Sequence, residues 1–143
     1  MSSLTLDDVK RAMVGAGLEV YRISGSEVRV AERARMHLMD SGVIVSVGQA
    51  TCVRVTVRSQ RSDFPTGRAD ELYELVRRAV KSTAEDRGFR EDAADSREIT
   101  DPVDSSSILD VWHELTFAKD VDRIDTLVED LQWALRLPKC VSP

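Results

Sequence analysis

The sequence predicts an α+β fold, in which helices pack mainly on one face of an antiparallel sheet of four to five strands. With 143 residues, 42% of them hydrophobic, the chain is long enough for one domain with a core, so residues 1–143 are expected to form a single domain. At Gly17, Gly42 and Gly88, a glycine follows helix-forming residues and precedes an apolar run. Glycine at such a place can end a helix and reverse the chain.

The chain begins with a predicted helix and strand. Thr5 followed by Asp8 has the pattern of a capping box, and the residues after it are apolar at helical spacing until Gly17 ends the helix. Residues 18–23 then alternate between apolar and polar and precede a Ser-Gly-Ser turn, which predicts a short strand.

Residues 27–40 fit two structures. As a helix, the segment would be capped by Ser26 and would align Val30, Ala34 and Leu38 on one face. As a strand, it would place the same three residues on one side as well. The Ala-Glu-Arg-Ala-Arg-Met run consists of strong helix formers, so its residue propensities favour a helix here.

Residues 43–60 are predicted to form a β-hairpin, because two β-branched runs are separated by Gly-Gln-Ala-Thr. Alternate residues of a strand point to opposite faces. In the second run, the residues expected in the core are Val53, Val55 and Val57. Those expected to face solvent or a partner are Arg54, Thr56 and Arg58.

The second half contains two further predicted helices. Residues 68–87 have an apolar stripe and end at Gly88, and residues 121–136 have a second stripe that Pro138 ends. Between them, the acidic and serine-rich segment 91–108 predicts a weak strand with a long mobile loop. Residues 111–117 alternate as a strand does.

Composition limits the class of protein. The amino terminus is acidic where a signal peptide would be basic, and no run approaches the roughly 20 apolar residues of a membrane span, so a cytoplasmic protein is expected. Cys52 and Cys140 have neither the number nor the spacing of a disulfide framework or zinc site, and are interpreted as reduced thiols. The net charge of −5 argues against general nucleic-acid binding.

The sequence contains no recognisable catalytic motif. His37 and His113 lack the neighbours of a triad or metal site, and His113 is interpreted as a neutral core histidine whose strand neighbour Glu114 points to the opposite face. The glycines are scattered and form no phosphate loop, and segment 91–108 lacks the central glycine of a calcium loop. We therefore expect no cofactor and no metal, and a protein without catalytic activity is favoured over an enzyme.

Two kinds of residue are candidates for binding a partner. Arg54, Arg58 and Arg61 could form a basic stripe for nucleic acid, but no aromatic residue is interleaved for base stacking, so a solvated strand face or contact with an acidic protein segment is favoured. Trp112 and Trp133 both lie off the apolar faces of their elements, and tryptophan is enriched at the centres of interfaces. The alternative for both tryptophans is burial in a core with two sides.

In its length, acidity and order of elements, the chain resembles the type III secretion chaperones and their structural relatives, and the match improves only if residues 27–40 are extended. The resemblance covers the whole chain but includes no sequence motif. It implies a homodimer that binds an unfolded stretch of a client protein without catalysis.

The leading hypothesis is a non-catalytic protein-binding adaptor or chaperone-like module that forms a homodimer and binds through exposed sheet edges, Trp112 and Trp133, with Arg54 and Arg58 as further candidates. Its partner would be another protein or a second copy of itself, and the acidic segment 91–108 would favour a basic partner. The competing class is a small-molecule-binding domain or enzyme whose pocket contains His113 with Glu114, or His37. Nucleic-acid binding through Arg54, Arg58 and Arg61 is the third class.

Overall fold

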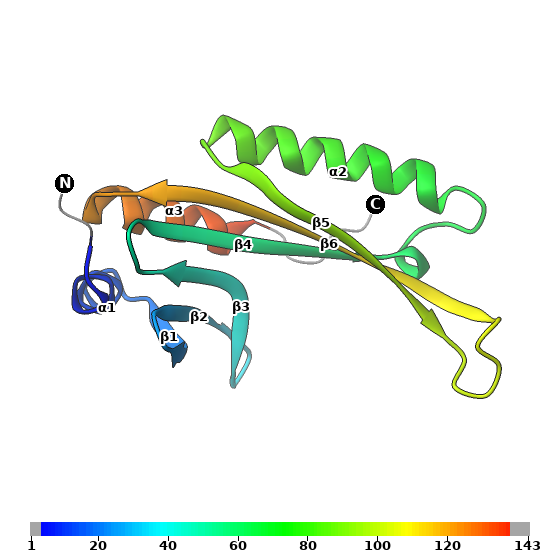
Figure 1. Ribbon diagram of the computed structural model, residues 1–143, viewed down its shortest axis with the longest axis horizontal. Helices are drawn as coiled ribbons and strands as arrows, with labels where there is room; N and C mark the ends of the chain where they lie inside the picture. The colour runs from blue at the N-terminus through cyan, green and yellow to red at the C-terminus, as the bar shows by residue number, and fades with distance from the viewer. Residues whose placement is uncertain (1–3, 138–143) are drawn as a thin grey trace. The chain divides into compact units, whose positions relative to one another are not determined.

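The computed structural model describes residues 4–137, which form three α-helices and a six-stranded antiparallel sheet (Figure 1). The sheet has the strand order β1-β2-β3-β4-β6-β5 and therefore exceeds the predicted four to five strands. In chain order the elements are α1 (Leu6–Gly15), β1 (Glu19–Ser24), β2 (Glu27–Ala34), β3 (His37–Ser46), β4 (Thr51–Gln60), the short 3-10 helix η1 (Arg61–Asp63), α2 (Ala69–Asp86), β5 (Arg90–Thr100), β6 (Ile108–Val121) and α3 (Ile124–Arg136).

The contacts divide the described residues into two compact units. Unit 1 consists of residues 4–55 and 118–137, and unit 2 of residues 56–117. Strands β4 and β6 contribute one part to each unit. Each unit is described by itself.

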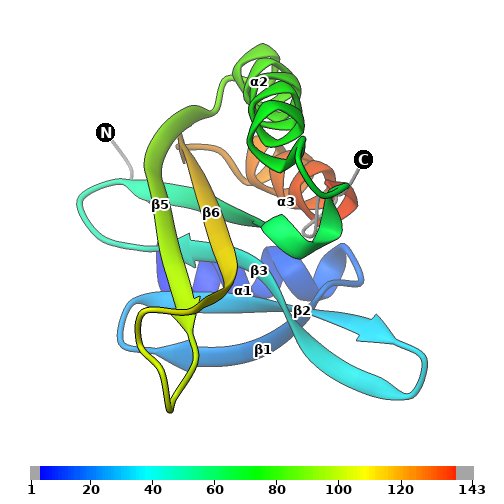
Figure 2. The same cartoon turned by 90° about the vertical axis from the view of Figure 1, so that its right-hand side faces the viewer.

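Unit 1 is a β-meander covered on one face by two helices. Strands β1, β2, β3 and the first part of β4 pair antiparallel in sequence, and α1 and α3 contact each other as well as β1 and β3, respectively (Figure 2). The side chains that are fully buried in this unit include Val9, Met13, Val28, Val30, Val43, Val45, Val53, Val55, Leu127 and Leu131. The apolar face of the meander and the apolar stripes of both helices thus form one core.

The helix predicted over residues 27–40 is wrong. Residues 27–34 form β2, and β3 begins at His37 after a tight turn in which Arg35 takes a positive φ of 60°. The pairing of β2 with β1 on one side and β3 on the other satisfies its backbone groups and buries Val28 and Val30 completely. Tertiary pairing therefore overrides the helix propensity of the Ala-Glu-Arg-Ala-Arg-Met run.

The ends of α1 agree with the sequence. The Thr5 hydroxyl accepts from the Asp8 backbone N–H at 3.1 Å, and the Asp8 carboxylate accepts from the Thr5 N–H at 2.9 Å, which is the predicted capping box. Gly17 follows the helix with a φ of +74°, and the Leu18 N–H donates to the Met13 carbonyl at 2.8 Å. This closure turns the chain directly into β1.

A buried ion pair joins the two C-terminal elements of unit 1. The Lys119 ammonium lies 3.0 Å and 3.2 Å from the two carboxylate oxygens of Asp130, and the Asp130 side chain is fully buried. Lys119 is on the last part of β6 and Asp130 is on α3, so the pair ties the helix to the strand that precedes it.

Unit 2 places α2 beside β5, with η1 leading into the helix (Figure 1). Its core contains Val57, Phe89, Leu115 and Phe117, each at most 4% exposed. The apolar stripe of α2 is covered only in part, since Ala84 alone is buried on this helix and Leu75 is 54% exposed. The predicted helix over residues 68–87 is confirmed.

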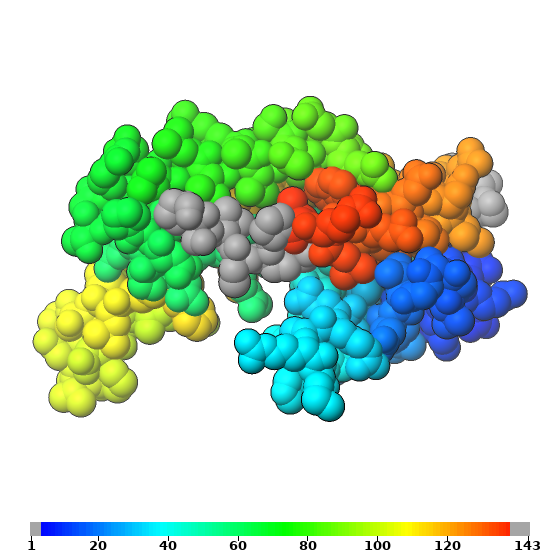
Figure 3. Space-filling model, turned by 180° about the vertical axis from the view of Figure 1, so that it is seen from behind, coloured from blue at the N-terminus to red at the C-terminus, as the bar shows by residue number. Residues whose placement is uncertain are grey.

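The acidic segment 91–108 is more regular than the sequence predicts. Residues through Thr100 belong to β5, so the connection to β6 is confined to residues 101–107. The Asp101 carboxylate accepts from the Val103 N–H at 2.8 Å, and Asp104 accepts from the Ser106 hydroxyl at 2.6 Å, which also lowers the pKa of Asp104. Figure 3 shows this connection (yellow) projecting beyond α2 (green). Pairing of β5 with β6 accounts for the added strand.

Two predictions concern residues outside the described range, namely the helix stop at Pro138 and the thiol of Cys140. Cys52 is buried on β4, and its thiol donates to the Val53 carbonyl at 3.8 Å. Within residues 4–137, no helix combines the length and apolar character that a membrane span requires.

Candidate functional site

One face of the strands in unit 2 carries an exposed aromatic side chain, Trp112. Trp112 lies on β6 and is 39% exposed. Its strand neighbours Val111 and His113 are less exposed, as the alternation of the strand predicts. The Arg97 guanidinium, from the neighbouring strand β5, lies 5.2 Å from the centroid of the Trp112 ring. This cation–π contact holds a large exposed aromatic ring in place.

Charged side chains flank Trp112 on the same face. Arg58 of β4 pairs with Glu114 of β6 at 3.1 Å, although both side chains remain exposed. Depressions of about 160 Å³ and 170 Å³ share Trp112 and Glu114 in their lining, and Arg97 lines the first while Arg58 lines the second. The arrangement is an aromatic side chain with charged side chains around it. We call these four residues the Trp112 surface: Arg58, Arg97, Trp112 and Glu114.

The α2 side of the same strands carries a polar cluster around His113. The His113 ring stacks on the Tyr73 ring of α2 with a centroid distance of 3.8 Å and an interplanar angle of 17°. Its Nδ1 shares a hydrogen bond of 2.7 Å with the Ser96 hydroxyl of β5. A cavity of about 270 Å³ opens beside the cluster and is also lined by Asp70, Glu74 and Arg77.

A Ser–His contact is one part of a nucleophilic site, but the arrangement here differs from a catalytic triad. In a triad, the serine contacts Nε2 while a carboxylate orients Nδ1. Here the serine contacts Nδ1 itself, so that nitrogen is not available to an orienting carboxylate. Among residues 4–137, no group of three or more His, Cys, Asp or Glu side chains could hold a metal ion.

The electrostatics of the cluster predict a dependence of stability on pH. Burial lowers the pKa of His113 below its ordinary value of 6.5, although the carboxylates of Asp70 and Glu74 oppose this effect. The unfolded chain therefore binds this proton more readily, and stability falls as pH decreases below about 6.5. As the pH is lowered from about 6.5 towards the range in which carboxylates titrate, we expect the Tm of His113→Gln to fall less than the Tm of the unaltered protein. An unchanged pH profile in urea or thermal unfolding would contradict this assignment.

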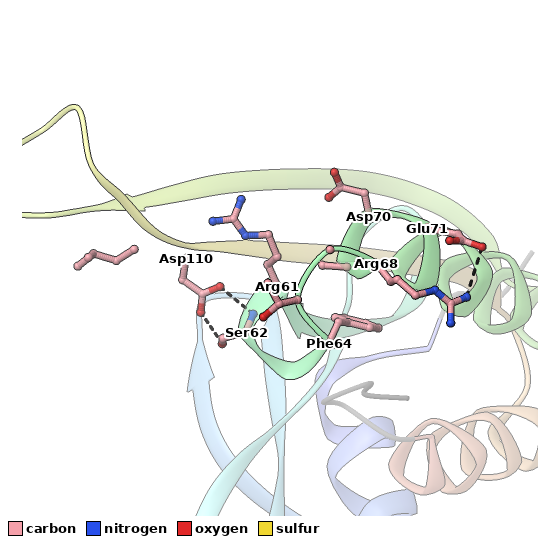
Figure 4. A pocket seen from close by; sticks show the side chains of 11 residues that line it. Arg61, Ser62, Phe64, Arg68, Asp70, Glu71 and Asp110 are labelled. Carbon is pink, nitrogen blue, oxygen red and sulfur yellow. Dashed lines mark hydrogen bonds and ion pairs between the residues drawn. The ribbon is translucent and has the colours of Figure 1, made fainter.

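An open depression of about 770 Å³ lies where η1 leads into α2 (Figure 4). Its lining includes Arg61, Phe64, Arg68, Leu109 and Asp110. Phe64 is buried, whereas Leu109 is 57% exposed. The charged groups outnumber the apolar ones, which is unlike a typical pocket for a small apolar ligand.

Three of the charged side chains in this depression, Arg68, Glu71 and Asp110, have partners within it. Asp110 accepts from the Ser62 hydroxyl at 2.7 Å and the Ser62 backbone N–H at 3.0 Å, and the hydroxyl contact lowers the pKa of Asp110 (Figure 4). Arg68 points to Glu71, with a separation of 3.5 Å. These contacts fix the loop between β4 and α2, which supports a structural role for the depression.

The other sequence candidates belong to unit 1 or line a different depression of unit 2. Arg54 belongs to unit 1 and donates to the Ser46 hydroxyl at 2.8 Å, whereas Arg61 lines the depression beside Asp110. Trp133 is half-buried on α3 in unit 1. His37 is exposed at the start of β3. Strand alternation points Glu114 and His113 to opposite faces of β6, although both residues contribute to the lining of the depression of about 170 Å³.

Sequence reasoning missed Ser96, Tyr73 and Arg97. Ser96 and Arg97 lie in the segment that the sequence presents as an acidic loop, and Tyr73 lies next to the predicted apolar stripe of α2. Their contacts join different strands and a helix, so they depend on pairings that local patterns do not specify. Residues 95–98 are all polar, so no alternation of apolar and polar residues in this stretch could have placed Ser96 and Arg97 on opposite faces.

Comparison of the chain with protein-family models, with curated proteins and with solved structures finds no match.

Proposed function

We propose that this protein is a non-catalytic protein-binding module and that Trp112 is the centre of its binding surface. The observation that carries the proposal is a tryptophan that is 39% exposed, held by Arg97 and bordered by the Arg58–Glu114 pair. Tryptophan and arginine are the residues most enriched at energetic centres of interfaces, and a polar rim surrounds such centres. The two depressions beside Trp112 offer space for side chains of a partner.

A chaperone-like role is part of this proposal. Residues 27–34 and 37–46 form strands, and an extended segment here improves the likeness to type III secretion chaperones. This supports the proposal through element order alone. A second copy of the chain is one possible partner, and light scattering on the purified protein would distinguish a homodimer from a monomer.

The experiment that tests the proposal is affinity capture from the native lysate with three forms of the tagged protein. We expect the unaltered protein to recover a partner in stoichiometric amount, and Trp112→Ala to recover at most about a tenth as much, since central tryptophans contribute 2 kcal/mol or more. Tyr21→Ala is the matched control, because Tyr21 is an aromatic residue of unit 1 with 41% exposure. Equal recovery by all three forms would reject Trp112 as the centre.

The cluster around His113 favours a second candidate function, the binding of a small molecule or an enzymatic reaction. Its observation is the 2.7 Å contact of Ser96 with His113 at the edge of a cavity of about 270 Å³. Ligand binding or turnover that is lost in Ser96→Ala and retained in Trp112→Ala would favour this candidate. The opposite pattern would favour the protein-binding module.

A further inference from the structure

Two opposite charges in the open depression of about 770 Å³ take no part in the contacts that fix the loop between β4 and α2. Among residues 4–137, neither Arg61 nor Asp70 makes a hydrogen bond or an ion pair through its side chain, whereas the other three charged side chains that line the depression are partnered. In Figure 4 both side chains extend upward, and no dashed line reaches either of them. Arg61 is half-buried and Asp70 is exposed.

Arg61 and Asp70 lie near the same imidazole ring but not in contact with each other. Burial is the main cause that lowers the pKa of His113, while the charge of Asp70 raises this pKa and the charge of Arg61 lowers it further. Although both charges act on one ring, they form no ion pair with each other. A group that carries a negative and a positive charge could therefore contact both side chains at once.

The remaining charges of the depression do not favour a ligand of a single sign. Asp110 is held mainly by the Ser62 hydroxyl at 2.7 Å, and Arg61 adds a weaker attraction to it without forming an ion pair. In total, two arginines and three carboxylates line the depression, so its charges are nearly balanced. A simple anion would meet the carboxylates, and a simple cation would meet the arginines. A ligand that carries both charges fits this balance.

We propose that the depression binds a small zwitterion of the amino-acid type, a free amino acid or a dipeptide, with its carboxylate at Arg61 and its ammonium group at Asp70. A guanidinium group donates two parallel hydrogen bonds to a carboxylate, and an ionised carboxylate accepts from an ammonium group. Phe64 and Leu109, which is 57% exposed, offer apolar contacts to the side chain of the ligand. A volume of about 770 Å³ lies within the range of small-molecule sites.

This inference goes beyond the proposed protein-binding function and does not depend on it, because none of the four residues of the Trp112 surface lines the depression. Asp70 also lines the cavity of about 270 Å³ beside His113. Ser96 lines that cavity but not the depression, so Ser96→Ala distinguishes the two sites.

The test is titration of the isotope-labelled protein with leucine and with the dipeptide Leu-Leu, in which the two charges are farther apart, while the backbone amide signals are followed by NMR. The control ligands are N-acetyl-leucine, which lacks the ammonium group, and leucinamide, which lacks the carboxylate. The variants are Arg61→Gln and Asp70→Asn. Their matched controls are Arg78→Gln and Asp86→Asn, because both residues are exposed on α2 and lie outside the lining of the depression.

We expect saturable binding of leucine or of the dipeptide with a Kd of about 1 mM, since the site is open and the ligand is small. The signals of residues 61–71 and 109–110 should shift most. Arg61→Gln and Asp70→Asn should each raise this Kd about tenfold, as expected for the loss of a charge-assisted hydrogen bond, and each control ligand should bind about tenfold more weakly to the unaltered protein. Arg78→Gln and Asp86→Asn should leave the Kd unchanged.

The control ligands also show which group contacts which side chain. N-acetyl-leucine has no ammonium group to place at Asp70, so Asp70→Asn should not weaken its binding. Leucinamide has no carboxylate, so Arg61→Gln should not weaken the binding of that ligand. Circular dichroism checks that each variant is folded, and the control ligands test both charges in the unaltered protein.

Three results would overturn the proposal. The first is the absence of saturable binding by both leucine and the dipeptide. The second is binding of N-acetyl-leucine or leucinamide as tight as that of leucine and the dipeptide. The third is loss of binding in a folded Ser96→Ala variant, which would assign the ligand to the cavity beside His113.

Discussion

Asp130→Ala is expected to reduce the free energy of unfolding by about 3 kcal/mol, because it leaves the Lys119 ammonium without its buried carboxylate. The Asp130 side chain is fully buried, and both of its carboxylate oxygens lie within 3.2 Å of Lys119, whose own side chain is 23% exposed. Chemical denaturation monitored by circular dichroism measures the change. A loss of this size would be a large fraction of the stability of a protein of this length.

The control for this prediction is an exposed ion pair on the same helix. Asp125 pairs with Arg123 at 3.2 Å, but their side chains are 66% and 72% exposed. Asp125→Ala should therefore cost less than about 0.5 kcal/mol. The double change Asp130→Leu with Lys119→Met removes both charges and should recover much of the loss. If Asp130→Ala and Asp125→Ala lowered the free energy of unfolding equally, burial would not increase the contribution of the Lys119–Asp130 pair to stability.

Phe117→Ala is expected to destabilise the protein by about 3–5 kcal/mol, because it opens a cavity in the core. Phe117 is fully buried on β6, whereas Trp112 on the same strand is 39% exposed on the other face. Trp112→Ala removes the larger side chain, yet it should cost only about 1 kcal/mol, since that ring is not enclosed by the core. Urea denaturation of both variants measures the two changes.

This comparison distinguishes an interface residue from a core residue. If Trp112→Ala destabilised the protein as much as Phe117→Ala does, Trp112 would belong to a core with two sides. A small stability loss combined with loss of partner binding would instead assign it to an interface.

Much of the fold follows from local patterns in the sequence. The capping box at Thr5 and Asp8 and the apolar stripes of α2 and α3 correctly predict the helices, because caps and helical periodicity are local properties. The β-branched runs around Val45 and Val55 likewise predict the β3–β4 hairpin.

Segment 27–40 shows where local information is insufficient. Its apolar residues fit both a helix and a strand, and its propensities favour a helix. The outcome depends on β1 and β3, which pair with both edges of β2 and bury Val28 and Val30. The energy of such long-range pairing cannot be read from the segment itself.

The sequence predicts the orientation of Trp112 but not the contacts that surround the candidate sites. Alternation along β6 correctly indicates that Trp112 points away from Leu115 and Phe117. The contact of Arg97 with the Trp112 ring and that of Ser96 with His113 require the pairing of β5 with β6 and were not predicted.

The most direct test of Trp112 as a binding centre is the affinity of a partner recovered by capture, measured by titration calorimetry with the unaltered protein, Trp112→Ala and Tyr21→Ala. A central tryptophan contributes 2 kcal/mol or more, so we expect Trp112→Ala to raise the Kd by about 30-fold or more. Tyr21→Ala should leave the Kd within about twofold, since the loss of an exposed side chain outside the interface changes little. A Trp112→Ala variant that is folded and binds with unchanged Kd would contradict the proposed function.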